Sequence, residues 1–223
     1  MTGIIFDFNG TMVFDEKFHT IAWEEFLEKR IGRKVTQEEM DKYVHGVNVI
    51  DTLRYFLKRD IEKEELKKLT LEKEAIYKDL CLKSNEYHLV DGLEEFLNYL
   101  KENKIPMNIA TAAGIDNLEF FFQTFNLSRW FDINKVSYDD GNIKGKPAPD
   151  IYIRAAERIN LSLKDCIVFE DAISGIIGAK RGCAKKVVGL TSSLSEKDLL
   201  ALGVDYFISD YRNLKKLKEI VLN

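Results

Sequence analysis

Hydrophobic and polar positions follow two different patterns along the chain. Between about residue 15 and residue 85, apolar side chains recur at helical spacing in a heavily charged segment, and no convincing strand interrupts it. Outside this segment, short apolar runs alternate with helical stretches. Strands that alternate with helices predict crossover connections and a parallel sheet, whereas the uninterrupted segment predicts an all-helical insertion.

Four helices are expected in the insertion. In the first, Phe18, Ala22 and Phe26 recur at helical spacing. Thr36 followed by Glu39 has the pattern of a capping box, so a second helix is expected to begin there. The other two helices are predicted at residues 49–59 and 62–83.

The rest of the chain predicts an α/β core. Strands are expected at residues 3–7, 106–111, 133–137, 166–169, 186–190 and 206–208, with helices at 92–103, 117–125, 150–159 and 173–181. The predicted fold class is therefore α/β: a doubly wound, Rossmann-like parallel sheet core with an inserted all-helical cap domain. We place the core at residues 1–14 and 86–223 and the cap at residues 15–85.

Composition suits a globular protein and narrows the classes of partner. The 223 residues are 45% hydrophobic and 31% charged, with a formal net charge of −4. Because the sequence has no dense basic patch, nucleic acid is not an expected partner. The chain begins directly in a strand and has no long apolar run, so we expect neither a signal peptide nor a membrane-spanning helix.

Cysteine usage indicates a reducing compartment. Cys81, Cys166 and Cys183 are widely spaced, and at least one of them must stay unpaired within the chain. We therefore expect a cytoplasmic protein. A monomer is our expectation, although the sequence does not fix the oligomeric state.

Polar side chains follow several of the predicted strands at the point where each strand ends. Asp7 ends the first, Thr111 the second, and Glu170 with Asp171 the strand at 166–169. Lys146 precedes a helix that opens with two prolines. Each residue alone has an ordinary explanation as a turn residue, a helix cap or a solvated lysine. Ligands of open parallel sheets bind at the carboxyl ends of strands, so the joint placement favours a site.

Four local patterns carry a family resemblance. They are Asp-Phe-Asn-Gly-Thr at residues 7–11, Ile-Ala-Thr at 109–111, Gly-Lys-Pro-Ala-Pro-Asp at 145–150 and Phe-Glu-Asp-Ala-Ile-Ser-Gly at 169–175. Together they resemble the motifs of the haloacid dehalogenase-like hydrolases, most closely the branch with β-phosphoglucomutase and small sugar-phosphate phosphatases. The resemblance implies a Mg²⁺-dependent phosphatase that acts on a small phosphorylated metabolite, a sugar phosphate being the expected one.

The resemblance also assigns a nucleophile and metal ligands. Asp7 is the implied nucleophile, which would form an aspartyl-phosphate. Mg²⁺ prefers oxygen ligands, and the implied ones are the carboxylates of Asp7 and Asp171 and the backbone carbonyl of Asn9. Glu170 is either a further ligand or a partner of one.

Other residues are implied to handle the phosphate and the substrate. Lys146 can neutralise charge on the nucleophile and on the phosphate. Thr111 and the backbone N–H groups near Ala112 can hydrogen-bond the phosphate oxygens. In the cap, His19 and His45 are candidate substrate contacts; His19 has the alternative role of a satisfied polar side chain at the edge of the cap core.

Asn9 is the first departure from the family pattern, which has an aspartate that acts as general acid and base. An amide cannot exchange a proton near neutral pH, and general acid–base catalysis is typically worth about 10²–10⁴-fold. We therefore expect slower expulsion of the leaving group and, more severely, slower hydrolysis of the aspartyl-phosphate. Asn9 could instead orient a water, merely finish a turn, or be a substitution introduced to trap an intermediate.

The cap loop at residues 45–49 is the second departure. The mutase carries an arginine there for a distal phosphate, and this chain has Val49. Arg54 is not an obvious substitute, and an ordinary interhelical turn is an equally good interpretation of the loop. Hydrolysis is therefore favoured over a β-phosphoglucomutase-like phosphotransfer.

Two further functions stay open. Asn9 and Val49 would suit a slow or inactive regulatory homologue that binds a phosphorylated ligand. Dehalogenation on the same fold is disfavoured, because the acidic pair at 170–171 calls for a cation that attack on a carbon–halogen bond does not need.

Overall fold

The computed structural model describes residues 2–45 and 47–222, and its contacts divide the chain into two compact units. One unit, the core unit, comprises residues 1–14 and 88–223; the other, the helical unit, comprises residues 15–87. The helical unit starts at the residue where the sequence placed the cap, and the core unit resumes two residues after the expected position 86.

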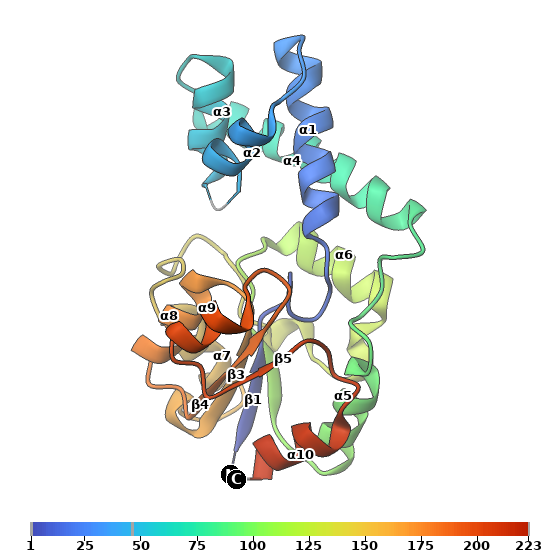
Figure 1. The fold of residues 1–223 in the computed structure, drawn as a ribbon, viewed down its shortest axis with the longest axis vertical. Helices are drawn as coiled ribbons and strands as arrows, with labels where there is room; N and C mark the ends of the chain where they lie inside the picture. Colours follow the sequence, from blue (N-terminus) through green and yellow to red (C-terminus); the bar gives the residue numbers. More distant parts are fainter. Residues whose placement is uncertain (1, 46, 223) are drawn as a thin grey trace. The chain divides into compact units, whose positions relative to one another are not determined.

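A five-stranded parallel sheet forms the centre of the core unit (Figure 1). The strand order is β2-β1-β3-β4-β5. The strands are β1 (Gly3–Phe6), β2 (Met107–Ile109), β3 (Cys166–Glu170), β4 (Lys186–Leu190) and β5 (Tyr206–Ile208). All pairings are parallel, and the order reverses at β1, so the predicted doubly wound fold class is confirmed.

Alternation along the strands sends neighbouring side chains to opposite faces of this sheet. Ile5 and Val168 join an apolar cluster with residues of α7 (Asp150–Glu157) and α8 (Ile173–Arg181). Phe6 and Phe169 stack on the other face with ring centroids 5.1 Å apart, in an aromatic cluster that continues to Phe96, Phe131 and Tyr211. The remaining helices of the unit are α5 (Leu93–Glu102), α6 (Ile115–Phe125), α9 (Glu196–Ala201) and α10 (Leu214–Leu222). Both faces of the central strands are therefore covered by apolar side chains.

The predicted strand at 133–137 is wrong. Residues Ile133–Lys135 form a 3₁₀ turn, and only Ser137 bridges to Ala110. The Asp132 side chain accepts a hydrogen bond from the backbone N–H of Asn134, which offers the backbone a local alternative to a strand ladder. The helices α9 and α10 are additions to the predicted elements.

The helical unit contains α1 (Glu16–Ile31), α2 (Gln37–Tyr43), α3 (Val49–Leu57) and α4 (Lys63–Lys83). The predicted capping box is confirmed, because Thr36 accepts from the N–H of Glu39 while the Glu39 side chain accepts from the N–H of Thr36. The unit has its own apolar core, which includes Trp23, Phe26 and Leu53. Each unit can therefore be understood as a separately packed body.

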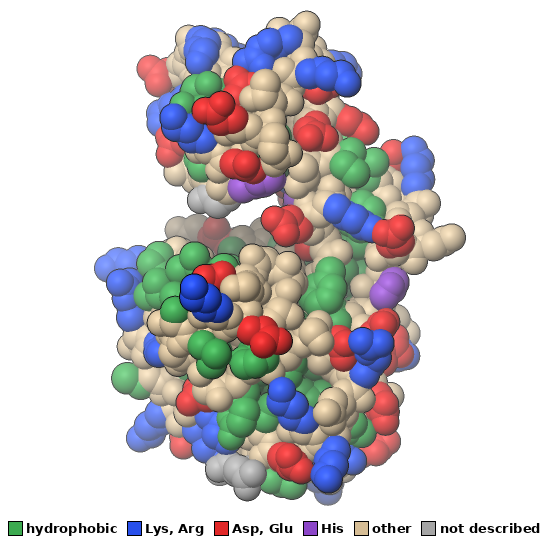
Figure 2. Space-filling view, in the orientation of Figure 1, with side chains coloured by type: hydrophobic (Ala, Val, Ile, Leu, Met, Phe, Trp, Pro, Cys, Tyr) green, Lys and Arg blue, Asp and Glu red, His purple; other side chains and the backbone are tan. Residues whose placement is uncertain are grey.

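Surface charge is mixed on the face drawn in Figure 2, where acidic and basic side chains are interspersed over both units. Within the described residues, no helix is both long and apolar enough to cross a bilayer.

Candidate active site

Strand register brings the first and third strands together at their carboxyl ends. Phe6 of β1 pairs with Phe169 of β3, so the next residues, Asp7 and Glu170, lie at the same level of the sheet. The backbone N–H of Asp7 donates to the carbonyl of Phe169 at 3.0 Å, which fixes Asp7 as a continuation of β1. The sheet itself therefore positions the predicted nucleophile.

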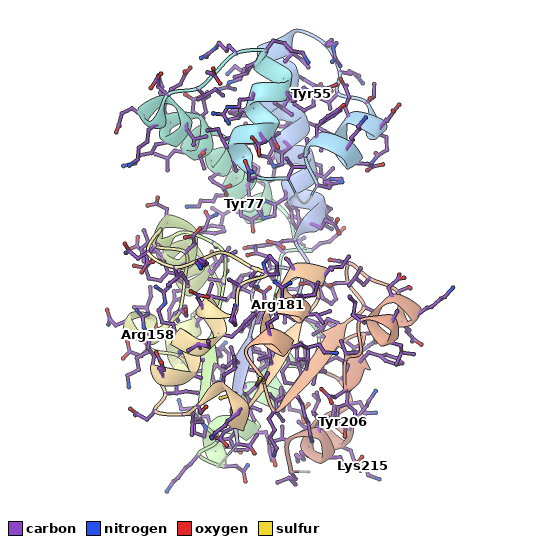
Figure 3. All side chains as sticks on the ribbon, turned by 90° about the vertical axis from the view of Figure 1, so that its left-hand side faces the viewer. Tyr55, Tyr77, Arg158, Arg181, Tyr206 and Lys215 are labelled. Atoms are coloured by element: carbon purple, nitrogen blue, oxygen red, sulfur yellow. The ribbon has the colours of Figure 1, made fainter. Side chains whose placement is uncertain are left out.

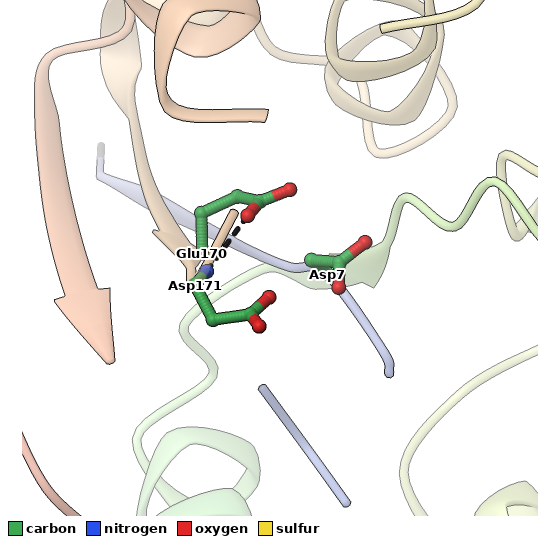
Figure 4. A group of neighbouring side chains, drawn as sticks. All are labelled: Asp7, Glu170 and Asp171. Atoms are coloured by element: carbon green, nitrogen blue, oxygen red, sulfur yellow. Dashed lines mark hydrogen bonds between the residues drawn. The ribbon is translucent and has the colours of Figure 1, made fainter. Parts of the chain in front are cut away.

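Three carboxylates meet at this edge. Asp7, Glu170 and Asp171 are 6%, 0% and 5% exposed, and each offers an oxygen within 4.8 Å of the others. Figure 4 shows the three side chains at the ends of β1 and β3, with the Asp171 carboxyl group extended toward Asp7. In the part of the chain that the structure describes, this is the one acidic cluster with the spacing of a metal site.

Lys146 joins two of these carboxylates. Its Nζ donates to Asp7 Oδ1 and to Glu170 Oε1, both at 2.5 Å. The sequence placed Lys146 at the rim of the site, but only 10% of its side chain is exposed. The Tyr152 hydroxyl donates to the same oxygen of Glu170 at 2.7 Å, and the Lys146 ammonium lies 5.2 Å from the centre of the Tyr152 ring.

Both carboxylate oxygens of Glu170 accept hydrogen bonds from neighbouring residues. Oε1 accepts from Lys146 and Tyr152, while Oε2 accepts from the backbone N–H groups of Asp171 and Ala172, each at 2.7 Å. Gly175, on α8, packs so closely beneath it that a Cβ atom would overlap the carboxylate. These contacts favour Glu170 as the partner that fixes Lys146, and the assignment of metal ligands within the cluster stays a prediction.

Asp171 is anchored by hydroxyl groups. Ser193 Oγ donates to its Oδ2 at 2.5 Å, Ser192 Oγ lies 3.3 Å from the same oxygen, and Thr11 Oγ1 donates to Oδ1 at 3.4 Å. Gly10 has φ +76°, and a Cβ there would collide with the Asp171 carboxylate, so both the turn and the close approach require glycine.

Asn9 lies in the tight turn that follows Asp7. It is half-buried and bridges to Val13, while the N–H of Gly10 donates to the Val13 carbonyl at 2.7 Å. These contacts to Val13 fix the backbone of the turn, and the role of the Asn9 carbonyl as a metal ligand stays a prediction.

Thr111 and Ala112 lie at the same edge of the sheet, after β2. Thr111 is buried, and its N–H donates to the Ser137 carbonyl at 2.9 Å. Its Oγ1 accepts from the N–H of Ala113 at 3.1 Å, which shapes the turn that leads into α6. Ala112 is exposed in this turn, where a phosphate could reach its backbone.

Electrostatics at the cluster favour an added cation. Burial raises the pKa of Asp7 well above its usual value, against the opposing effect of Lys146 and with support from Glu170 and Asp171. Burial and then the Glu170 carboxylate raise the pKa of Asp171 to about 6. Burial lowers the pKa of Lys146, but Asp7 and Glu170 outweigh it and the net shift is upward. Three carboxylates facing one ammonium leave two negative charges uncompensated, which is the charge of one divalent ion.

The two candidate histidines lie in the helical unit, among contacts of that unit. His19 Nδ1 is 3.0 Å from Lys73 Nζ, and the His19 ring stacks on Tyr77 with centroids 4.0 Å apart. Tyr77 is labelled in the helical unit in Figure 3. His45 Nε2 is 3.2 Å from Thr20 Oγ1, and its Nδ1 is 3.4 Å from an Asp41 carboxylate oxygen. The predicted substrate loop at 45–49 includes residue 46, which is outside the described residues.

Sequence reasoning missed four residues of the core site. Tyr152, Ser192, Ser193 and Thr11 all contact the acidic cluster. Thr11 belongs to one of the four motifs, and the serines follow a predicted strand, so strand-end position was an available signal for both. Tyr152 lies inside a helix and has no comparable signal.

Comparisons with known proteins agree with this geometry. Residues 1–182 match the family model described as haloacid dehalogenase-like hydrolase. The chain is 27% identical over 233 residues to the phosphorylated carbohydrates phosphatase of Thermotoga maritima, covering 99% of this chain and 100% of that protein. It is 26% identical to the β-phosphoglucomutase of Mycobacterium bovis, covering 94% and 90% of the two chains. A solved HAD hydrolase, family IA, variant 3, from Entamoeba histolytica aligns over 100% of both chains with a TM-score of 0.91 and 34% identity.

Proposed function

The chain belongs to the haloacid dehalogenase-like hydrolase family, whose matched relatives include phosphatases of small phosphorylated substrates, and we propose that it is a Mg²⁺-dependent phosphatase that works through an aspartyl-phosphate on Asp7. A sugar phosphate is the proposed substrate, since the relatives include a phosphatase of phosphorylated carbohydrates.

The observation that carries the proposal is the contact between Lys146 and Asp7 beside two further carboxylates. A nucleophilic carboxylate that attacks a phosphate must overcome repulsion between two negative groups. The ammonium at 2.5 Å from Asp7 reduces that repulsion at the reacting group itself. The same ammonium is anchored by Glu170, so it is already oriented before a substrate arrives.

The donor set fits Mg²⁺. This ion takes oxygen ligands and commonly uses one or two carboxylates together with waters and a phosphate. Asp7 and Asp171 would hold it, with the backbone carbonyl of Asn9 as a further oxygen, and Glu170 would act through Lys146. When bound, Mg²⁺ would neutralise carboxylate and phosphate charge near the phosphorus.

The proposed reaction has two displacements at phosphorus. In the first, an Asp7 carboxylate oxygen bonds to phosphorus as the ester P–O bond breaks, and the leaving oxygen takes up a proton. In the second, a water oxygen attacks the same phosphorus, the bond to Asp7 breaks, and the water gives up a proton. Phosphate leaves and the Asp7 carboxylate is regenerated. Thr111 and the N–H groups near Ala112 would bind the phosphate oxygens in both steps.

Asn9 is expected to slow the second displacement more than the first. Because an amide neither donates nor accepts a proton near neutral pH, the alcohol must take its proton from solvent, and the attacking water has no side-chain base at this position. A substrate whose leaving group is stable as an anion avoids the first difficulty but not the second. We therefore expect the aspartyl-phosphate to form faster than it is hydrolysed.

A second candidate function is a phospho-ligand-binding regulator that turns over slowly. Asn9 favours it, as does Val49, which opens α3 where the mutase has an arginine. A β-phosphoglucomutase-like phosphotransfer is the less favoured alternative, because Val49 cannot bind a second phosphate.

Steady-state hydrolysis of a panel of sugar phosphates, with Mg²⁺ present and then chelated, tests the proposal. We expect turnover that chelation abolishes and magnesium restores. A phosphatase rate that is unchanged by chelation would contradict the metal assignment. Tight phosphate-ester binding without turnover, also in an Asn9→Asp variant, would instead support the regulator.

A further inference from the structure

A short loop after β4 reaches the acidic cluster from an element outside the family motifs. Residues 191–194 connect Leu190, the last residue of β4, to Ser195, which caps α9. The N–H of Thr191 donates to the Ile208 carbonyl at 3.0 Å, so the first residue of the loop is held against the end of β5. β4 pairs with β3, with Gly189 opposite Glu170, which places this loop at the same edge of the sheet as the site.

The two serines of this loop have different acceptors. Ser193 Oγ donates to Asp171 Oδ2 at 2.5 Å. Ser192 Oγ lies 2.6 Å from the carbonyl of Gly10 and 3.3 Å from Asp171 Oδ2, so its single proton goes to the nearer acceptor. One hydroxyl therefore fixes a carboxylate while its neighbour fixes the turn that follows the nucleophile.

These contacts enclose one oxygen of Asp171. Oδ2 is the oxygen nearer to Gly10, where a Cβ atom would lie 2.1 Å from it and 2.9 Å from Oδ1, and it is Oδ2 that receives the Ser193 hydroxyl. Oδ1 receives only the 3.4 Å contact from Thr11 among the hydrogen bonds of the described residues. The Asp171 carboxyl group, turned toward Asp7 in Figure 4, is thus held in a single orientation with Oδ1 left for another ligand.

We propose that Ser193 is a positioning residue for Asp171, holding its carboxylate in the orientation that binds the divalent ion, and that Ser192 ties the same loop to the Gly10 turn. This inference rests on the proposed metal site. Hydrogen-bond partners of metal ligands orient those ligands, and their loss typically lowers metal affinity by about 10–100-fold.

An isosteric pair of variants tests the hydroxyl alone. Ser193→Thr keeps the donor and Ser193→Val removes it, while the two side chains have nearly the same shape. Ser193 is an exposed residue, so both variants should fold. The measurement is Mg²⁺ affinity by isothermal titration calorimetry, with no substrate present. The unfolding midpoint in ion-free buffer is recorded for each variant.

A matched control comes from a surface serine that also donates to an aspartate. Ser209 is exposed, and its Oγ lies 3.4 Å from an Asp210 oxygen. Ser209→Ala should leave Mg²⁺ affinity unchanged. For Ser193→Val we expect the dissociation constant to rise by about 10–100-fold. Ser193→Thr should stay within about threefold of the unaltered protein, which is small beside that effect.

The outcomes separate this inference from the proposed function. If the unaltered protein binds Mg²⁺ and Ser193→Val binds it equally well, the positioning role is overturned while the phosphatase proposal stands. The positioning role is also overturned if Ser193→Val lowers the ion-free unfolding midpoint but not the affinity, because the contact would then be structural only. If the unaltered protein does not bind Mg²⁺, both proposals are overturned.

Discussion

Each unit buries a cluster of ionisable side chains, and the two clusters differ in charge balance. In the helical unit, Lys73 donates to Glu74 at 2.8 Å and contacts His19, while the Tyr77 hydroxyl donates to Asp15 at 2.6 Å. The core cluster has three carboxylates against the single ammonium of Lys146.

The difference shows what each cluster contributes. In the helical unit Lys73 offsets Glu74, while Asp15 accepts from Tyr77 and lies 3.5 Å from His19, so one formal negative charge is left with side-chain partners of that unit. We expect this cluster to contribute to the folding of that unit. The core cluster is left with excess negative charge in a buried place, which is costly unless a cation or protons compensate it. Burial of unbalanced charge is therefore the better indicator of a site than burial of charge alone.

Replacement of Asp7, the proposed nucleophile, is expected to have the largest effect. Asp7→Asn removes the oxygen that would bond to phosphorus, so kcat/KM for any hydrolysed phosphate should fall by about 10⁴-fold or more. It also removes one of three crowded carboxylates, so the unfolding midpoint in ion-free buffer should stay the same or rise. Kinetics and circular dichroism melting check the two parts. Retained activity in a folded variant would contradict the assignment of Asp7.

The second-largest expected effect is a gain in turnover. Asn9→Asp supplies a group that can protonate the leaving oxygen and deprotonate water, so turnover should rise by about 10²–10⁴-fold. Burst kinetics should also disappear, since hydrolysis of the intermediate would no longer lag behind its formation. Rapid-quench measurement on an aryl phosphate checks both. An unchanged rate would show that position 9 has no role in proton transfer.

The contributions of the two units to stability should change with pH in opposite directions. The pKa of Asp171 is raised to about 6 from 3.8, so in ion-free buffer the native state binds more protons than the unfolded chain between these values. Stability from this group is full below pH 3.8 and falls as the pH rises through about 6, by on the order of 3 kcal/mol. Magnesium should therefore raise the unfolding midpoint far more at about pH 7 than at about pH 4.5.

Glu39 of the helical unit provides the opposite case. The Arg33 hydrogen bond lowers its pKa to about 2 from 4.5, so its contribution is present above pH 4.5 and is lost as the pH falls through about 2. Magnesium should not affect this transition. Melting curves that show the same magnesium increment at both pH values would contradict the electrostatic account of the core cluster.

The smallest expected effect is a loss of stability in the helical unit. Asp15→Asn weakens the charged acceptor of the Tyr77 hydroxyl, which should lower the free energy of unfolding by about 1–3 kcal/mol. Unlike Asp7→Asn, it should therefore lower the ion-free unfolding midpoint. Chemical denaturation of the two variants side by side checks the contrast, and a gain in stability from Asp15→Asn would break the comparison between the clusters.

Prediction from sequence succeeded where backbone geometry places a residue. Asp7 and Glu170 are brought together by the register of two parallel strands, and apolar runs that end in a carboxylate reveal those strands directly. The strand at 133–137 failed because Asp132 caps a local turn, and an apolar pair such as Ile133 and Val136 suits a turn as well as a strand.

Contacts between side chains that are distant in sequence could not be predicted, for a different reason. Tyr152 contacts Glu170 across 18 residues, and Ser193 contacts Asp171 across 22. Neither pair has a local pattern, because the helix phase of α7 and the path of the loop after β4 decide which side chain reaches the cluster. In the helical unit the contact between His19 and Lys73 spans 54 residues and depends on how two helices pair.

A substitution at Gly175 would act on Asp7 indirectly, through two other side chains. Its bare backbone on α8 makes room for Glu170, and Glu170 in turn holds the Lys146 ammonium against Asp7. A single added methyl group at this position would displace the Glu170 carboxylate and, with it, the Lys146 ammonium. No atom of Gly175 needs to touch a substrate for this to happen. The proposed activity therefore depends on a helix position that an inspection of substrate contacts would pass over.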